Sequence, residues 1–186
     1  SRSYVEAMGQ ALGTQVRLGR RVHAIRRNGE SVTVTCETGE QHDFDHVVLA
    51  THADDSLRML TEPTALDREL LGAFAYADNE AVMHTDIRAM PRRSAAWSSW
   101  NYLASSTAGQ KRPAITYWMN RLQQLEGYEP VFVTLNPIGE IDPGKIIRRQ
   151  TYRHPMFTEA TLAAQKRLWS LQGQSGLWFC GAWFGA

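Results

Sequence analysis

The fold is decided by the stretch Asp45-His46-Val47-Val48-Leu49-Ala50-Thr51-His52-Ala53. Its apolar run, residues 47–50, contains no alternating polar residue, which is typical of a strand buried on both faces of a parallel sheet. Small and polar residues follow at once, and a helix is expected to begin near Asp54. Ligands of open α/β sheets bind beyond the carboxyl ends of strands, so this strand end is a candidate ligand site. A strand that ends in a tight turn explains the same pattern without a ligand.

A second segment near the end of the chain has the same build: Trp178-Phe179-Cys180-Gly181-Ala182-Trp183-Phe184-Gly185-Ala186. An apolar strand is followed by glycine and alanine, and glycine there lets a phosphate or a ring system lie against the main chain. A core strand followed by a glycine turn is the alternative. We interpret Cys180 as a small core residue, because no base or cation lies near it in the sequence.

The rest of the chain predicts a mixed α/β protein. Ser3 and Glu6 form an S-x-x-E capping box, which predicts a first helix that ends at Gly13. Further helices are expected from about Asp54, from Thr64 and over residues 158–171. Strands are expected over residues 15–18, 22–27, 31–37, 47–50, 81–85, 97–103, 114–119, 131–135, 145–152 and 177–180, with a turn after 39 leading toward Phe44. Residues 80–155 therefore predict an independent, mostly antiparallel sheet, and the last helix and strand are expected to return to the first part.

The composition excludes several classes of protein. The chain has 186 residues, 43% of them hydrophobic and 21% charged, with a net charge of +1. Nothing in this balance points to a nucleic-acid partner, and no apolar run approaches the roughly 20 residues that span a bilayer. The two cysteines form no paired motif, which favours a reducing, cytoplasmic setting. The histidines show no metal-ligand spacing, so no metal site is expected.

Aromatic residues gather on two of the expected strands. Trp100, Asn101, Tyr117 and Trp118 are candidates for lining an apolar substrate cavity. The same side chains could instead form the core of the second sheet. The sequence contains no glycine fingerprint for a dinucleotide, no P-loop and no G-x-S-x-G nucleophile motif.

The chain resembles the flavin-containing amine oxidoreductase family, and in particular its bacterial subgroup of predicted NAD/FAD-binding dehydrogenases. The resemblance runs over nearly the whole chain, and its specific parts are the tryptophan-rich stretch and the Phe-Cys-Gly-Ala-Trp stretch. It rests on residues 1–5, 21–25, 47–53, 91–93, 96–102, 116–122 and 178–183. Members of this family are about twice as long as this chain and carry the glycine fingerprint for FAD in an N-terminal βαβ unit.

The resemblance implies a partial, Rossmann-like FAD-binding domain over residues 1–53 and a substrate-type domain over 54–157. Residues 158–186 are expected to return to the FAD domain. Val22 would meet the adenine end of FAD. The other cofactor-binding residues implied are Ala50, Thr51, His52, Gly181, Ala182 and Trp183.

The activity implied is hydride transfer from an unidentified, apolar or amine-bearing small molecule to the flavin. No position matches a catalytic base. Because the βαβ unit is missing, we expect a truncated protein that lacks a complete FAD site, is inactive alone and self-associates through exposed apolar surfaces. The main alternative is a non-catalytic α/β binding or interaction module, and a flavin fold that has lost turnover is a third interpretation.

Overall fold

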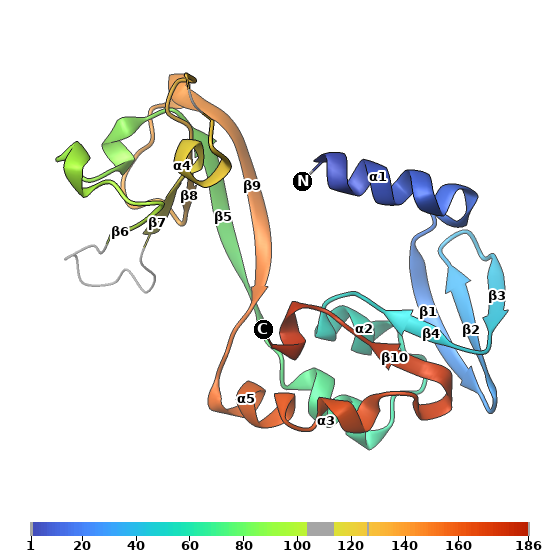
Figure 1. The fold of residues 1–186 in the computed structure, drawn as a ribbon. Helices are drawn as coiled ribbons and strands as arrows, with labels where there is room; N and C mark the ends of the chain where they lie inside the picture. The colour runs from blue at the N-terminus through green and yellow to red at the C-terminus, as the bar shows by residue number, and fades with distance from the viewer. Residues whose placement is uncertain (1, 104–113, 126, 186) are drawn as a thin grey trace. The chain divides into compact units, whose positions relative to one another are not determined.

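The structure, a computed structural model, describes residues 2–103, 114–125 and 127–185 (Figure 1). The chain divides into two compact units, which are Ser1–Ala75 with Pro155–Ala186, and Tyr76–His154. The boundaries expected from the sequence lay after residues 53 and 157. The two helices that follow the decisive strand pack on elements of the first unit.

The first unit begins with helix α1, Arg2–Leu12. Because the helix already includes Arg2, Ser3 lies within its first turn and not at the N-cap position that the capping box requires. The strand expected over residues 15–18 is absent from this described segment, where a 3-10 turn, Gly13–Gln15, is followed by irregular chain.

A three-stranded antiparallel sheet follows, formed by β1 (Val22–Asn28), β2 (Ser31–Cys36) and β3 (Gln41–Phe44). Gly29 forms the turn between the first two strands with a φ of 71°, a left-handed conformation that glycine adopts without steric cost. Strands β1 and β2 agree with the ranges expected over residues 22–27 and 31–37, because the residue pattern of a strand is a local signal. Strand β3 was not expected, since the sequence predicted only a turn leading toward Phe44.

The decisive stretch forms β4 (Val47–Leu49), which pairs in parallel with β10 (Leu177–Phe179). The parallel pairing predicted from the apolar run is therefore confirmed. The expected burial on both faces was wrong, because Leu49 is buried whereas Val48 is 62% exposed. The exposed face carries Val48 and Trp178, and Trp178 is 40% exposed.

Three helices cover the buried side of the first unit: α2 (Ala53–Met59), α3 (Ala65–Gly72) and α5 (Glu159–Gln165). The single helix expected over residues 158–171 was wrong, since α5 ends at Gln165 and a 3-10 helix follows at Leu168–Leu171. The amide of Arg167 bonds to the carbonyl of Ala164, a three-residue spacing that tightens the chain and ends the α-helix.

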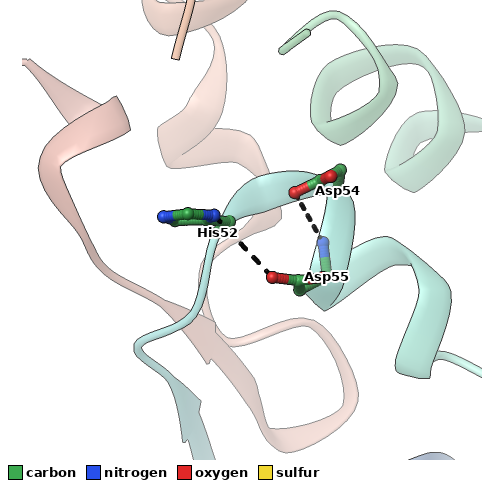
Figure 2. Close-up of side chains that lie close together, drawn as sticks. All are labelled: His52, Asp54 and Asp55. Atoms are coloured by element: carbon green, nitrogen blue, oxygen red, sulfur yellow. Dashed lines mark hydrogen bonds and ion pairs between the residues drawn. The ribbon is translucent and has the colours of Figure 1, made fainter. Parts of the chain in front are cut away.

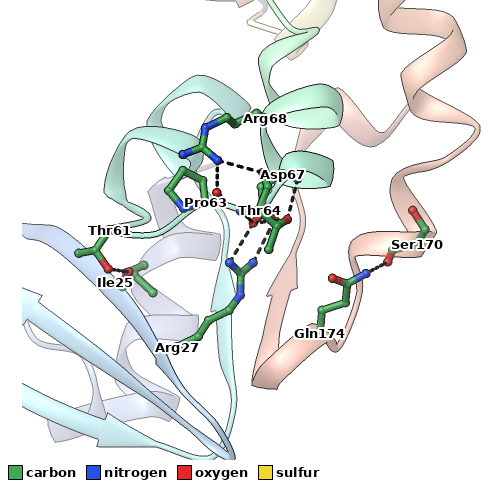
Figure 3. Close-up of polar contacts among 9 residues, drawn as sticks. All are labelled: Ile25, Arg27, Thr61, Pro63, Thr64, Asp67, Arg68, Ser170 and Gln174. Atoms are coloured by element: carbon green, nitrogen blue, oxygen red, sulfur yellow. Dashed lines mark hydrogen bonds and ion pairs between the residues drawn. The ribbon is translucent and has the colours of Figure 1, made fainter.

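A buried ion pair ties the first sheet to α3 (Figure 3). The Arg27 guanidinium donates two hydrogen bonds to the Asp67 carboxylate, at 2.8 and 3.0 Å. Asp67 also accepts from the backbone N–H of Thr64, and the Thr64 side chain in turn accepts from the Asp67 amide, which completes a capping box. Nearby, the Thr61 amide bonds to the Ile25 carbonyl at 3.0 Å. The Asp67 side chain therefore both caps helix α3 and anchors strand β1.

The second unit is a five-stranded sheet in the order β6-β7-β8-β5-β9. Neighbouring strands β6 and β7, β7 and β8, and β8 and β5 are antiparallel. The strands are β5 (Tyr76–His84), β6 (Trp100–Leu103), β7 (Ala114–Trp118), β8 (Phe132–Leu135) and β9 (Ile146–Pro155). A short helix that the sequence pattern missed, α4 (Met119–Gln123), follows β7. Within the described ranges, no helix combines the length and the apolar character needed to cross a bilayer.

Candidate functional site

The ends of β4 and β10 lie side by side. The Cys180 amide donates to the Leu49 carbonyl at 2.9 Å, which extends the parallel ladder to the last residues of both strands. Ala50 and Thr51 therefore leave the sheet at the same edge as Gly181 and Ala182, and all four residues are exposed. The tertiary structure thus brings together two segments that are about 130 residues apart in the sequence.

Trp183 holds the two strand ends together. Its indole N–H donates to the main-chain carbonyl of Thr51 at 3.0 Å, and the side chain is only 2% exposed. The ring packs edge-on against Phe74, with centroids 5.3 Å apart, and the Trp183 carbonyl accepts from the Gln165 side chain at 2.9 Å. Since the ring is buried in the first unit, Trp183 orients the surrounding backbone and does not itself present a free aromatic face.

Gly181 makes this arrangement possible. Its φ of 146° lies in the range that side-chain-bearing residues rarely adopt, and a Cβ there would lie 2.8 Å from the indole nitrogen of Trp183. Glycine at this position therefore follows from a close approach between backbone and ring. The small residues around it leave main chain exposed at the strand end.

An open pocket of about 510 Å³ adjoins the end of β10. Its lining is mainly aromatic and apolar: Val48, Trp169, Gln172, Trp178, Phe179, Cys180, Gly181 and Phe184. Cys180 is an exposed free thiol at this edge, whereas the other cysteine, Cys36, is buried. The interpretation of Cys180 as a core residue was therefore wrong, because its side chain alternates to the face opposite Phe179.

Polar side chains gather where β4 gives way to α2 (Figure 2). Ligand atoms of His52, Asp54 and Asp55 lie within 4.8 Å of one another. The Asp55 amide donates to Asp54 at 2.9 Å, and His52 approaches Asp55 at 3.8 Å. Arg58, one turn further along α2, contacts Asp55 at 2.6 Å and Asp54 at 3.6 Å. These contacts describe the acidic first turn of a helix balanced by a basic residue in its last turn.

Val22 is the one candidate cofactor residue away from these strand ends. It is the first residue of β1 and pairs with Cys36 in the antiparallel sheet. No hydrogen bond or ring contact in the described part of the chain links Val22 to Thr51 or Gly181.

The four candidate substrate residues divide between the two faces of the second sheet. Trp100 and Tyr117 are direct cross-strand partners, and Trp100 is 59% exposed. Asn101 faces the other way and is buried, with its side chain bonded to the Ser98 amide and carbonyl at 3.0 and 2.7 Å. Trp118 shares the face of Asn101 and packs against Trp97 at 5.3 Å. Only Trp100 and Tyr117 therefore lie on the open face.

A buried polar chain crosses the core of the second unit, and sequence analysis missed it. His84 accepts from the Asp86 amide through Nδ1 at 3.1 Å, so its Nε2–H donates to the Thr134 hydroxyl at 2.8 Å. Thr134 in turn lies 2.9 Å from the Thr116 hydroxyl. Burial lowers the pKa of His84, despite the nearby negative charge of Asp86, so this imidazole is neutral. No sequence signal marks these residues, because they sit on three separate strands.

Comparison with known proteins identifies a related family. Residues 1–85 match the sequence family described as flavin-containing amine oxidoreductase. A search among curated proteins found no match to this chain.

Several solved structures share the fold. Wild-type putrescine oxidase bound to putrescine superposes with a TM-score of 0.60 at 12% identity, over 96% of this chain and 46% of that chain. Reduced UDP-galactopyranose mutase gives 0.60 at 12% identity, over 96% and 45%. Cyclohexylamine oxidase from Brevibacterium oxydans IH-35A gives 0.59 at 11% identity, over 96% and 46%.

The chain spans less than half the length of each of these structures. At such low identity the likeness to these structures shows the fold alone, and the match to the family model covers residues 1–85. Residues 1–85 match the sequence model of the flavin-containing amine oxidoreductase family, and the chain as a whole is similar in fold to putrescine oxidase and cyclohexylamine oxidase.

Proposed function

We propose that this chain supplies the strand ends and the substrate-side sheet of an FAD-dependent oxidoreductase, which transfers a hydride from an organic substrate to the flavin. The observation that supports this most strongly is the parallel pair β4 and β10, whose exposed ends are joined by Trp183 and Thr51. Ligands of open α/β sheets lie beyond such strand ends. When bound, the flavin supplies the electron-accepting chemistry, and the protein supplies binding, orientation and exclusion of water.

The residues present fit part of a flavin site. Exposed main chain at Ala50, Thr51, Gly181 and Ala182 would allow a flat or phosphorylated group to approach closely. His52 would border this group, and Trp183 would hold the backbone in place from below. Val22, in the antiparallel sheet, would contact the adenine end. The sequence lacks a glycine fingerprint for the pyrophosphate, so we propose that FAD binding requires a βαβ unit that this chain does not contain.

The open face of the second sheet is the proposed substrate side. Trp100 and Tyr117 lie on this face, and Tyr102, two residues beyond Trp100, is 72% exposed. Such a surface suits an apolar or amine-bearing small molecule, because aromatic rings offer both apolar area and a face for a cation. Asn101 and Trp118, on the buried face, would act by supporting this surface. Membership of the bacterial dehydrogenase subgroup and a cytoplasmic setting are further parts of this proposal.

The decisive experiment is a visible absorption spectrum of the full parent protein, recorded beside this 186-residue chain with FAD added. We expect a flavin band in the purified parent and no retained flavin in the chain alone. A colourless parent that takes up no FAD would contradict the proposal and favour the alternative, a non-catalytic binding or interaction module.

The isolated chain is also proposed to self-associate. Helix α1 presents an apolar stripe in which Tyr4 and Val5 are 68% and 66% exposed, and Met8 and Leu12 are each 47% exposed. Large exposed apolar patches promote association in water. Sedimentation at several concentrations should show oligomers that the double change Val5→Ser with Met8→Ser reduces. A monomer at all concentrations would contradict this part of the proposal.

A further inference from the structure

The two edges of the β4–β10 sheet differ in how their backbone groups are satisfied. In a parallel ladder, successive residues direct their N–H and C=O groups to opposite edges. Because Cys180 N–H donates to Leu49 O, the groups of Leu49 face β10 and those of Phe179 and Leu177 face away from β4. The outward groups of Leu177 and Phe179 therefore form the free edge of β10.

All four of these outward groups have partners from the segment just before the strand. The Leu177 carbonyl accepts from the Gly173 amide at 2.8 Å, and the Leu177 amide donates to the Gln174 carbonyl. The Phe179 amide donates to the side-chain oxygen of Gln172 at 2.9 Å, and the Phe179 carbonyl accepts from the side-chain nitrogen of Gln172 at 2.7 Å. The Gln172 amide thus makes the pair of hydrogen bonds that a residue of a neighbouring strand would make.

The geometry of this segment is specific. Gly173 has a φ of 75°, and a Cβ there would lie 3.1 Å from the Trp178 ring. This turn lets the chain double back so that the Gln172 side chain lies alongside Phe179. By contrast, the outward groups of Val48 on β4 face an edge on which the described part of the chain places no strand.

We propose that the Gln172 side chain takes the place of a neighbouring strand and thereby protects the free edge of β10 from pairing with another strand. Its two hydrogen bonds also fix the position of Phe179, shortly before the turn at Gly181. Exposed strand edges are templates for unwanted pairing, and proteins cover them with bulges, charges or loops. Here a single side-chain amide, within hydrogen-bond distance of both groups of one residue, has this role. The inference concerns the sheet and does not depend on flavin binding.

Residue-resolved amide hydrogen exchange on the chain tests this proposal. The change Gln172→Ala removes both bonds, so we expect the Phe179 amide to exchange about fivefold faster or more, as the loss of one neutral hydrogen bond implies. The Cys180 amide, bonded to Leu49, should keep its protection. The matched control is Gln174→Ala, since within the described part of the chain the Gln174 side chain has its hydrogen bond to the Ser170 carbonyl, at 2.5 Å, and none to β10 (Figure 3).

A second variant separates the two bonds. Gln172→Glu keeps an acceptor for the Phe179 amide but, as a carboxylate, cannot donate to the Phe179 carbonyl. We expect wild-type exchange at Phe179 in this variant, and larger assemblies in sedimentation for Gln172→Ala than for Gln174→Ala. The proposal is overturned if Phe179 exchanges no faster in Gln172→Ala than in Gln174→Ala. Equal acceleration at Phe179 and Cys180 would also overturn it, because it would indicate general loosening of the strand.

Discussion

The indole nitrogen of Trp183 lies 3.0 Å from the main-chain oxygen of Thr51, and this hydrogen bond joins the ends of the two parallel strands. Both partners sit in the candidate cofactor region. Replacing Trp183 by Phe removes the donor but keeps a ring next to Phe74. We expect a loss of about 1–2 kcal/mol in the free energy of unfolding, because the Thr51 carbonyl loses its partner.

Denaturant unfolding followed by circular dichroism measures this loss. The control is Trp169→Phe, since the Trp169 side chain is 77% exposed and its truncation removes little buried area. Equal stability of the Trp183 and Trp169 variants would show that the hydrogen bond to Thr51 contributes nothing.

Gly181→Ala should destabilise the strand end. The new Cβ would lie 2.8 Å from the Trp183 indole nitrogen, at a backbone conformation that alanine disfavours. We expect a cost of about 1–3 kcal/mol and a shift in tryptophan fluorescence as the Trp183 ring moves. Gly9→Ala in α1 is the control with the opposite sign, because no atom lies within 4 Å of its Cβ position and alanine favours a helix. A Gly181→Ala protein as stable as the wild type would argue against the close approach.

The Arg27–Asp67 pair should contribute to stability in a pH-dependent way. Burial alone would raise the pKa of Asp67, but the hydrogen bonds from Arg27 and Thr64 outweigh it, so the pKa lies below the 3.8 of an ordinary aspartate. A carboxyl whose pKa is lower in the folded state stabilises the fold above the unfolded pKa. This contribution is lost as the pH falls through the folded pKa.

Two variants separate this pair from an exposed one. Arg27→Ala leaves the Asp67 carboxylate buried without its partner and should cost about 3 kcal/mol or more. Arg167→Ala is the matched control, because the Arg167–Glu69 pair is more than half exposed on both sides and its removal should have no measurable effect. In Asp67→Asn, the loss of stability as the pH falls below about 4 should be smaller than in the wild type. Similar effects of the two arginine changes would contradict the assignment of a buried pair.

His84 should make the second unit less stable in mild acid. Burial lowers its pKa below the 6.5 of an ordinary histidine, so in mild acid the unfolded chain binds a proton that the folded chain does not. Stability is therefore complete above the unfolded pKa and falls as the pH drops from about 6.5 toward the folded pKa. Thermal unfolding between pH 7.5 and 5, roughly the window in which an ordinary histidine titrates, measures this.

The change His84→Gln should flatten this part of the pH profile, because it removes the buried imidazole. A wild-type profile that is flat across this range would show that His84 does not titrate with folding.

The sequence alone was sufficient for features that depend on neighbouring residues. The alternation over residues 31–37 predicted β2, and the unbroken apolar run over residues 47–50 predicted a parallel strand, which pairs with β10. Such signals are local, because side-chain periodicity follows directly from backbone geometry. The same reasoning placed one long helix at residues 158–171, where hydrogen bonds spaced by three residues instead end α5 at Gln165.

The tertiary structure decided what depends on distant residues. Register and packing bring Trp183 to Thr51 and Gln172 to Phe179. They also turn Asn101 inward and Trp100 outward. No short segment of the sequence encodes these relationships. The same holds for His84, Thr134 and Thr116, which lie on three strands and meet only when the sheet is assembled. The sequence determined which elements form, and the long-range pairing of those elements determined which side chains share a site, because a contact between distant residues depends on the position of both backbones.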